Sequence, residues 1–164
     1  FRRSVVYVLD HDEDGALGVI VNRPLDSGVE DVLPQWSDRV NAPDCLLEGR
    51  PVSRDAALAL GVVADARHGP DGGRQTSGRV GLVDLVGPAP APGLFLGLRV
   101  FAGYAGWSAG QLESEIDEGS WIVVPALESD VTSAVPETLW SEVLRRQPGD
   151  TKYWSTLPDD PGLN

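Results

Sequence analysis

The sequence has very little cysteine and histidine. Its single cysteine, Cys45, cannot form an internal disulfide, and two histidines among 164 residues are too few for a closed zinc site of Cys and His ligands. No apolar run reaches the roughly 18 residues that a membrane-spanning helix needs. The first residues, FRRSVVYVLD, lack the apolar core and cleavage site of a signal peptide. We therefore expect a cytoplasmic protein without membrane contact.

Positive charge is also scarce. Thirteen Lys and Arg residues stand against twenty-five Asp and Glu, so the net charge is -12. This charge repels a phosphate backbone at long range unless arginines cluster on one face, and here they are scattered. The sequence contains neither a phosphate-binding loop nor a dinucleotide-binding glycine fingerprint, and it lacks the basic and aromatic pattern of single-strand binders. We expect no direct nucleic-acid binding, no cofactor and no metal.

The apolar segments that are present alternate irregularly between strand-like and helix-like patterns. Residues 4–9 and 16–22 are β-branched runs separated by the turn-forming DHDEDG, which predicts a β-hairpin. Residues 55–65, DAALALGVVAD, fit a helix or a strand equally well. The length suits one domain over residues 1–164, and strands mixed with a few helices predict the α+β class. Further strands are expected at CLLEGRPV, VGLVDLV, LFLGLRVFAGYA and WIVVP, and helices at 29–40, directly after Ser108 and at 136–149.

Two stretches are predicted to lack regular structure. Residues 67–79, RHGPDGGRQTSGR, contain four glycines and a proline, a composition typical of an exposed loop. Residues 147–164 are predicted to form an irregular C-terminal tail.

Residues 106–110, GWSAG, match the G-x-S-x-G nucleophile elbow of serine hydrolases. In that fold the catalytic histidine follows the serine, whereas His11 and His68 both precede Ser108. We therefore reject a serine hydrolase site. The S-x-x-Q spacing instead predicts a capping box, in which the Ser108 hydroxyl accepts a hydrogen bond from the Gln111 amide and the glutamine side chain reaches back.

The acidic turn DHDEDG, residues 10–15, reproduces the first positions of a calcium-binding loop. The twelfth position, where calcium loops have a bidentate glutamate, falls on Val21, so the residues are interpreted as a hairpin turn. His11 within this turn has two open interpretations. It is either a hydrogen-bonded structural imidazole or the acid or base of a pocket.

The helix expected after Ser108 carries Glu115 between two tryptophans in sequence, Trp107 and Trp121. Two interpretations remain open. The tryptophans are core residues around a capped helix, or they form the aromatic wall of a pocket whose polar group is Glu115.

Three stretches, RSVVYVLDHDEDGALGVIVNRPL, EGRPV and GYAGWSAGQLESEIDEGSW, resemble the bacterial YqgE/AlgH family of uncharacterised proteins. The resemblance covers nearly the whole chain, and its motifs occur in the family's order. The matching residues are Arg3 and Ser4, then His11, Gly15, Ala16, Gly18, Asn22 and Pro24, and finally Tyr104 to Trp107, Gly110 to Glu113, Glu115, Gly119 and Trp121.

The resemblance implies an α+β fold with a bent or bifurcated β-sheet, a small part closed into a barrel, and a few surrounding helices. Family members usually begin about twenty residues earlier, with an apolar segment that ends in acidic residues, so the resemblance implies an incomplete N-terminal segment here. The family's G-G-P-V is replaced by residues 49–52, GRPV, with Arg50 at a usual glycine position.

Three functional hypotheses follow. The first is a binding or regulatory module for a small ligand or a protein partner. The second is a small enzyme with His11 or Glu115 as general base. The third is an indirect transcriptional regulator that does not bind DNA itself, because some family members are labelled regulators and the charge of -12 disfavours DNA contact. In the first hypothesis, the residues that line or brace one pocket are His11, Asn22, Arg23, Tyr104, Trp107, Gln111 and Glu115.

Overall fold

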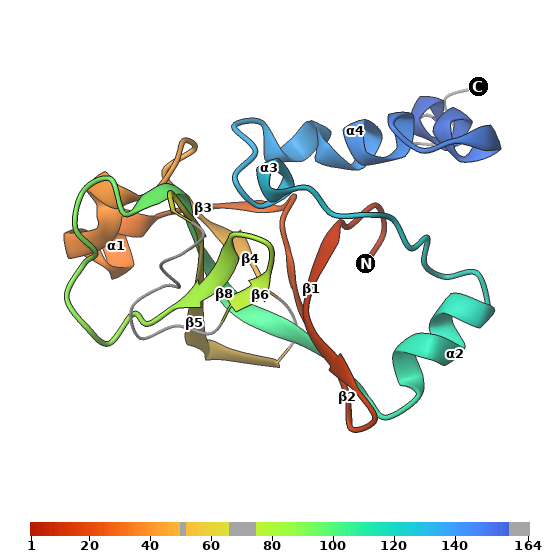
Figure 1. The fold of residues 1–164 in the computed structure, drawn as a ribbon, viewed down its shortest axis with the longest axis horizontal. Coiled ribbons are helices and arrows are strands. Elements are labelled where there is room, and N and C mark those ends of the chain that lie inside the picture. The colour runs from red at the N-terminus through yellow and green to blue at the C-terminus, as the bar shows by residue number, and fades with distance from the viewer. Residues whose placement is uncertain (50–51, 66–74, 158–164) are drawn as a thin grey trace.

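A computed structural model describes residues 1–49, 52–65 and 75–157. Its centre is an eight-stranded sheet, in which β1, β2, β8, β5, β7 and β6 follow one another and β3 and β4 form a branch (Figure 1). The helical elements lie around this sheet, so the predicted α+β class is confirmed. The strands are β1 (Val6–Asp12), β2 (Gly15–Ile20), β3 (Pro24–Gly28), β4 (Cys45–Glu48), β5 (Val52–Val63), β6 (Gln75–Ser77), β7 (Val80–Val83) and β8 (Phe95–Ser108).

The long strand β8 divides the sheet. Along one edge it pairs antiparallel with β5. Along the other it pairs in parallel with β4 at Phe101 and Ala102, and then antiparallel with β2 from Ala105 to Ser108. Two different strands therefore share one edge of β8, which is the bifurcation that the resemblance implied. The expected small closed barrel is not formed by the described strands, because the path of pairing is open and ends at β1 and β6.

Both faces of β8 are covered, as expected for a central strand. On one face, Leu98 and Val100 pack with Trp36 of the 3-10 helix η1. On the other, Phe101 packs with Tyr7 of β1 and with residues of α3 and α4. Two apolar layers result, one on each side of the sheet. The helical elements are α1 (Val29–Val32), α2 (Gln111–Asp117), α3 (Glu128–Val131) and α4 (Leu139–Arg145), with 3-10 helices η1 (Pro34–Arg39), η2 (Pro136–Thr138) and η3 (Gly149–Thr156).

Several sequence predictions need correction. The ambiguous run at 55–65 is strand, because β5 pairs on both of its edges, with β7 and β8. The helix expected over 29–40 is interrupted at Leu33, after which Pro34 starts a separate 3-10 helix. Part of the expected irregular tail forms η3. In the predicted 67–79 loop, residues 66–74 lie outside the described part of the chain, and β6 occupies residues 75–77.

The segment after α2 departs most from its prediction. Residues 121–125, WIVVP, are rich in β-branched residues, yet they form no strand. A strand requires a hydrogen-bonded neighbour, and among the described residues no strand is paired with this segment. In Figure 1 the segment runs as an irregular trace from α2 to α3, with the N-terminus between it and β1.

The departure from the family pattern at Arg50 lies outside the described residues. Gly49, beside it, is described and lies close to β8. A Cβ atom on Gly49 would stand 1.9 Å from the carbonyl oxygen of Gly103, so this position admits only glycine.

Candidate functional site

The carboxylate of Glu115 binds three side chains at once. Its Oε2 accepts hydrogen bonds from the indole Nε1 of Trp107 at 3.0 Å and of Trp121 at 2.7 Å. Its Oε1 accepts a third from Nε2 of Gln111 at 3.0 Å. The bonds from Trp121, Gln111 and Trp107, in that order of effect, hold the pKa of Glu115 below its ordinary value. Glu115 is thus an anion that braces two tryptophans, which is unfavourable for a general base.

The two tryptophans and Phe1 form an aromatic cluster beside this carboxylate. The ring centroids of Trp107 and Trp121 lie 6.0 Å apart at an interplanar angle of 77°, an edge-to-face arrangement. The ring of Phe1 stacks on Trp107 at 5.9 Å and 23°, and it contacts Trp121 at 5.2 Å. Trp107 is buried, but Phe1 remains 54% exposed. One side of the cluster is therefore open to solvent.

The predicted capping box at Ser108 is only partly formed. Gln111 does reach back, and its Oε1 accepts from the Ser108 backbone N–H at 3.1 Å and from its hydroxyl at 3.2 Å. The Ser108 hydroxyl does not cap the helix, because Ser108 ends β8 and the N-cap residue is Gly110, with φ 73°. The prediction missed this left-handed turn, which only glycine adopts readily. Ser108 therefore donates to a side chain and is held on the surface.

His11 meets the same helix through a different residue. Its Nε2 lies 2.5 Å from Oε1 of Glu113, and both side chains are 48% exposed. The Glu113 carboxylate accepts hydrogen bonds from the backbone N–H of Glu113 and from His11, and these bonds lower its pKa. The contact fastens the tip of the β1–β2 hairpin to α2, which fits the structural interpretation of this histidine.

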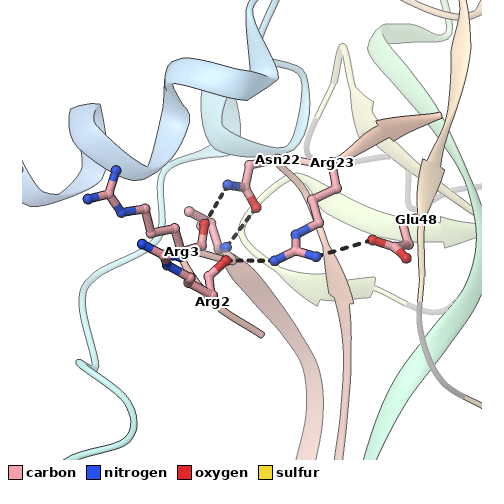
Figure 2. A network of polar contacts seen from close by, with 6 residues as sticks. Arg2, Arg3, Asn22, Arg23 and Glu48 are labelled. Carbon is pink, nitrogen blue, oxygen red and sulfur yellow. Dashed lines mark hydrogen bonds and ion pairs between the residues drawn. The ribbon is translucent and has the colours of Figure 1, made fainter. Parts of the chain in front are cut away.

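Asn22 and Arg23 fasten the other end of the hairpin (Figure 2). Asn22 Oδ1 accepts from the Val5 N–H at 2.8 Å, and its Nδ2 donates to the Arg3 carbonyl at 2.9 Å. The Arg23 guanidinium donates to the Arg2 carbonyl at 2.6 Å and pairs with Glu48 at 3.5 Å. Both side chains thus hold the residues that precede β1.

The seven residues predicted to share one pocket fall into separate groups. His11 lies opposite Ala16 in the hairpin, and Asn22 follows six residues later, roughly 20 Å away at the rise of a strand. Tyr104 lies opposite Val52 and packs against the core. Trp107, Gln111 and Glu115 form one cluster with Trp121, and Asn22 and Arg23 form another at the residues before β1.

A cavity of about 280 Å³ adjoins this cluster, between β1 and the segment that follows α2. Val6 and Val8 of β1 line one side, and residues 121–124 line the other. Leu112 and Ile116 of α2 close one end, and residues of α4 close the opposite end. Of the seven predicted residues, Trp107 alone is among its described lining residues. The signal that could have located the cavity is the β-branched run at residues 122–124.

Arg3 is the one charged side chain among the described residues that line this cavity. Its backbone has φ 53°, a left-handed conformation that is uncommon for a residue with a side chain. Its guanidinium lies 4.6 Å from the centre of the Trp140 ring and donates to the Leu157 carbonyl at 2.8 Å. The cavity therefore has an aromatic end at Trp107 and Trp121 and a basic end at Arg3 and Trp140.

Neither a metal cluster nor a membrane span is found among the described residues. No three His, Cys, Asp or Glu side chains there are grouped so that they could hold a metal ion. The described helices also lack the length and apolarity needed to cross a membrane.

The sequence matches the model of the AlgH-like family over residues 1–152. This chain belongs to the AlgH-like family. It is 51% identical over 171 aligned residues to a UPF0301 protein of Streptomyces coelicolor, covering 100% of this chain and 87% of that protein. It is 50% identical over 161 residues to a UPF0301 protein of Nocardia farcinica, covering 96% of this chain and 75% of that protein. The YqgE/AlgH resemblance of the sequence is confirmed.

Solved structures agree with this assignment. A crystal structure of a Corynebacterium diphtheriae protein has a TM-score of 0.88 and 36% identity, over 96% of this chain and 84% of that one. The solution structure of AlgH from Pseudomonas aeruginosa has a TM-score of 0.67 over 96% and 85% of the two chains. At 24% identity, AlgH shares the fold. In this AlgH-like chain, Glu115 and the three side chains that bind it all lie in the run from Tyr104 to Trp121 that resembles the family motif.

Proposed function

We propose that the protein is a binding module for a ligand or protein partner, and that the apolar cavity beside β1 is its binding site. The supporting observation is that apolar residues line this cavity and yet remain in contact with solvent. Val123 is 72% exposed, and the others lie between 43% and 54% exposed, namely Phe1, Val8, Ile122 and Trp154. Contiguous exposed apolar residues of this kind mark binding surfaces.

The polar residues around the cavity favour binding over catalysis. Glu115 accepts three hydrogen bonds and is held ionised, so it has little tendency to take up a proton. His11 is paired with Glu113 on the surface and is not among the residues that line the cavity. What these groups do is hold Trp107 and Trp121 in fixed positions. A rigid aromatic wall is suited to recognition of an apolar group.

This binding role fits a cytoplasmic protein with a regulatory role. The single cysteine suits a reducing compartment. A protein partner held in the cavity would give the regulatory role of the first hypothesis without any contact to DNA, which the net charge of -12 disfavours.

The test uses an apolar fluorescent dye such as anilinonaphthalene sulfonate, added to the native protein at neutral pH. We expect saturable binding with enhanced dye fluorescence, and loss of this binding in Val123→Asp. The matched control is Val86→Asp, because Val86 is 96% exposed and does not line the cavity. Equal dye binding by both variants would place the apolar site elsewhere.

A further inference from the structure

A second cavity shares Arg3 and Trp140 with the apolar one but has a polar lining. It lies where the residue after β2, Asn22, meets η2, α4 and η3, and its volume is about 570 Å³. Small-molecule sites typically have ~300–1,000 Å³. Among its described lining residues, Trp140 alone is apolar, and four carry hydroxyl groups, namely Thr138, Ser141, Ser155 and Thr156. This polar cavity therefore suits a small polar ligand.

The polar cavity is lined by more positive than negative charge, although the chain is strongly acidic. Arg3 and Arg145 line it together with one acidic residue, Glu137, whereas the whole chain has a net charge of -12. Arg145 is exposed, and its Nε donates to the Ser141 carbonyl at 3.3 Å. Among the described residues, no acceptor takes a hydrogen bond from its two terminal nitrogens, so both can serve a ligand. The cavity thus favours an anion.

The fold fixes Arg3 at the wall of this cavity. Its backbone has φ 53°, a conformation that costs energy for a residue with a side chain and persists where surrounding contacts impose it. Figure 2 shows one such contact, in which Asn22 Nδ2 donates to the Arg3 carbonyl at 2.9 Å. The Arg3 guanidinium lies 4.6 Å from the centre of the Trp140 ring and donates to the Leu157 carbonyl at 2.8 Å. A cation held in place in this way lowers the entropic cost of binding an anion.

The donors around the polar cavity match a phosphate group. Phosphate oxygens accept hydrogen bonds from guanidinium groups in pairs, and they also accept from hydroxyls. A phosphate directs its oxygens tetrahedrally, so it can reach donors that lie on α4 and on η3 at the same time. The cavity has room for more than the phosphate, and its walls there carry hydroxyls and the Glu137 carboxylate. These groups pair with ligand hydroxyls, not with an apolar chain.

We propose that the polar cavity binds a small phosphorylated ligand with a hydroxylated carbon skeleton, of the sugar phosphate class. Arg3 and Arg145 pair with the phosphate, and the hydroxyl-bearing walls hydrogen-bond the skeleton. This site is additional to the apolar cavity of the proposed function. Because Arg3 and Trp140 line both cavities, a ligand in the polar cavity contacts a wall of the apolar one.

The test is isothermal titration calorimetry of the protein with ribose 5-phosphate, with inorganic phosphate and ribose as its two parts. At about pH 7.5 a phosphate monoester is doubly charged, and about 0.15 M salt screens unspecific attraction. We expect saturable binding of ribose 5-phosphate, weaker binding of phosphate and none of ribose. Equal affinity for phosphate and ribose 5-phosphate would overturn the assigned skeleton. Failure of both to bind would overturn the site.

Two charge-removing variants localise the phosphate. Arg145→Met should weaken binding of ribose 5-phosphate about tenfold or more, because a charge-assisted hydrogen bond is lost. Lys152→Met is the matched control, since Lys152 is an exposed cation on η3 that does not line the polar cavity. It should leave the affinity within about twofold of wild type, because salt screens an exposed charge. Equal losses in the two variants would reveal a general charge effect and overturn the site.

Two charge-adding variants test the cavity itself. Ser141→Asp places a carboxylate in it and should abolish binding, whereas Ser27→Asp, at an exposed position of β3 outside the cavity, should not. Neither residue belongs to the apolar core, and urea unfolding verifies that both variants fold.

Nuclear magnetic resonance gives the position of the ligand directly. Ribose 5-phosphate should shift the amide signals of Ser141 and Thr156. Shifts confined to the indole signals of Trp107 and Trp121 would place the ligand in the apolar cavity and overturn the polar site. The dye test of the apolar cavity uses none of these variants, so either site can fail without the other.

Discussion

The indole of Trp121 donates a hydrogen bond of 2.7 Å to the carboxylate of Glu115, six residues earlier in the chain. This bond joins the irregular segment after α2 to the helix itself, and a second bond from Trp107 joins that helix to the end of β8. One anion therefore fixes three elements around the apolar cavity. Much of the protein's expected response to mutation and pH follows from this arrangement.

Replacing Glu115 by glutamine should destabilise the protein by about 1–2 kcal/mol. Glutamine retains one oxygen, so it cannot accept from both tryptophans and Gln111 together, and hydrogen bonds to a charged group are the stronger ones. Urea unfolding followed by tryptophan fluorescence measures the change. Glu118→Gln is the control, because Glu118 is exposed and has a 3.4 Å contact with Ser114. Equal losses in the two variants would contradict the bracing role.

Stability should depend on pH through Glu115. Hydrogen bonds from Trp121, Gln111 and Trp107 lower its pKa in the folded protein below the ordinary 4.5. The ionised carboxylate therefore stabilises the fold at pH above that value, and the stabilisation is lost as the pH falls through the lower pKa of the folded state. The gap in unfolding free energy between wild type and Glu115→Gln should be largest near neutral pH and should narrow in acid. A gap that widens in acid would reverse the assigned sign.

Arg99 should be intolerant of substitution. It is 1% exposed, and its guanidinium donates to the backbone carbonyls of Asn41, Ala42, Pro43 and Ser133 at 2.5–2.7 Å. Burial lowers its pKa. Arg99→Met leaves these acceptors unpaired and should cost about 3 kcal/mol or more. Thermal unfolding compares it with Arg145→Met, at an exposed arginine on α4, which should change little.

Gly110 should be sensitive to substitution through its backbone alone. A Cβ there would meet nothing within 4 Å, but the residue has φ 73°. Gly110→Ala should therefore cost about 1–2 kcal/mol of left-handed strain. Gly87 also has open space around its Cβ position, without a positive φ, so Gly87→Ala should lie within about 0.5 kcal/mol of wild type. Matching urea curves for the two variants would refute the strain argument.

Ser108 should matter less than Gln111. The Ser108 hydroxyl makes one exposed bond to the glutamine, so Ser108→Ala should cost at most about 0.5 kcal/mol. Gln111→Ala removes the acceptor for the Ser108 N–H and a donor to Glu115, and should cost more. Chemical denaturation of both variants shows which substitution lowers the free energy of unfolding more. A larger loss at Ser108 would restore the capping role that the sequence suggested.

Local patterns were sufficient to predict the elements that depend on local chemistry. The hairpin around the DHDEDG turn, the central strand ending near Ser108 and the helix beginning near Pro136 all carry their own turn residues or periodicity. The run at 55–65 stayed ambiguous because Ala59 and Leu60 of β5 are buried on opposite faces of the sheet, and a strand covered on both faces shows no alternation.

The grouping of side chains was not predictable to the same degree. Motif order along the chain placed His11 with Glu115, whereas pairing in the sheet brings it to Glu113. The prediction of a strand at residues 121–125 is wrong because a strand needs a paired neighbour, and local propensity does not supply one. Helical spacing placed Gln111 and Glu115 on one side of the helix, and in the structure both contact one another there while Trp107 reaches Glu115 from the end of β8.

The fastening of the residues before β1 by Asn22 has a practical consequence. Because Asn22 binds the backbone of both Arg3 and Val5, the chain turns back there, and Phe1 is delivered to the open side of the Trp107 and Trp121 pair. The side chain at position 1 therefore sits at the mouth of the cavity. A small environment-sensitive fluorophore attached through the side chain at this position would report directly on whether the cavity is filled.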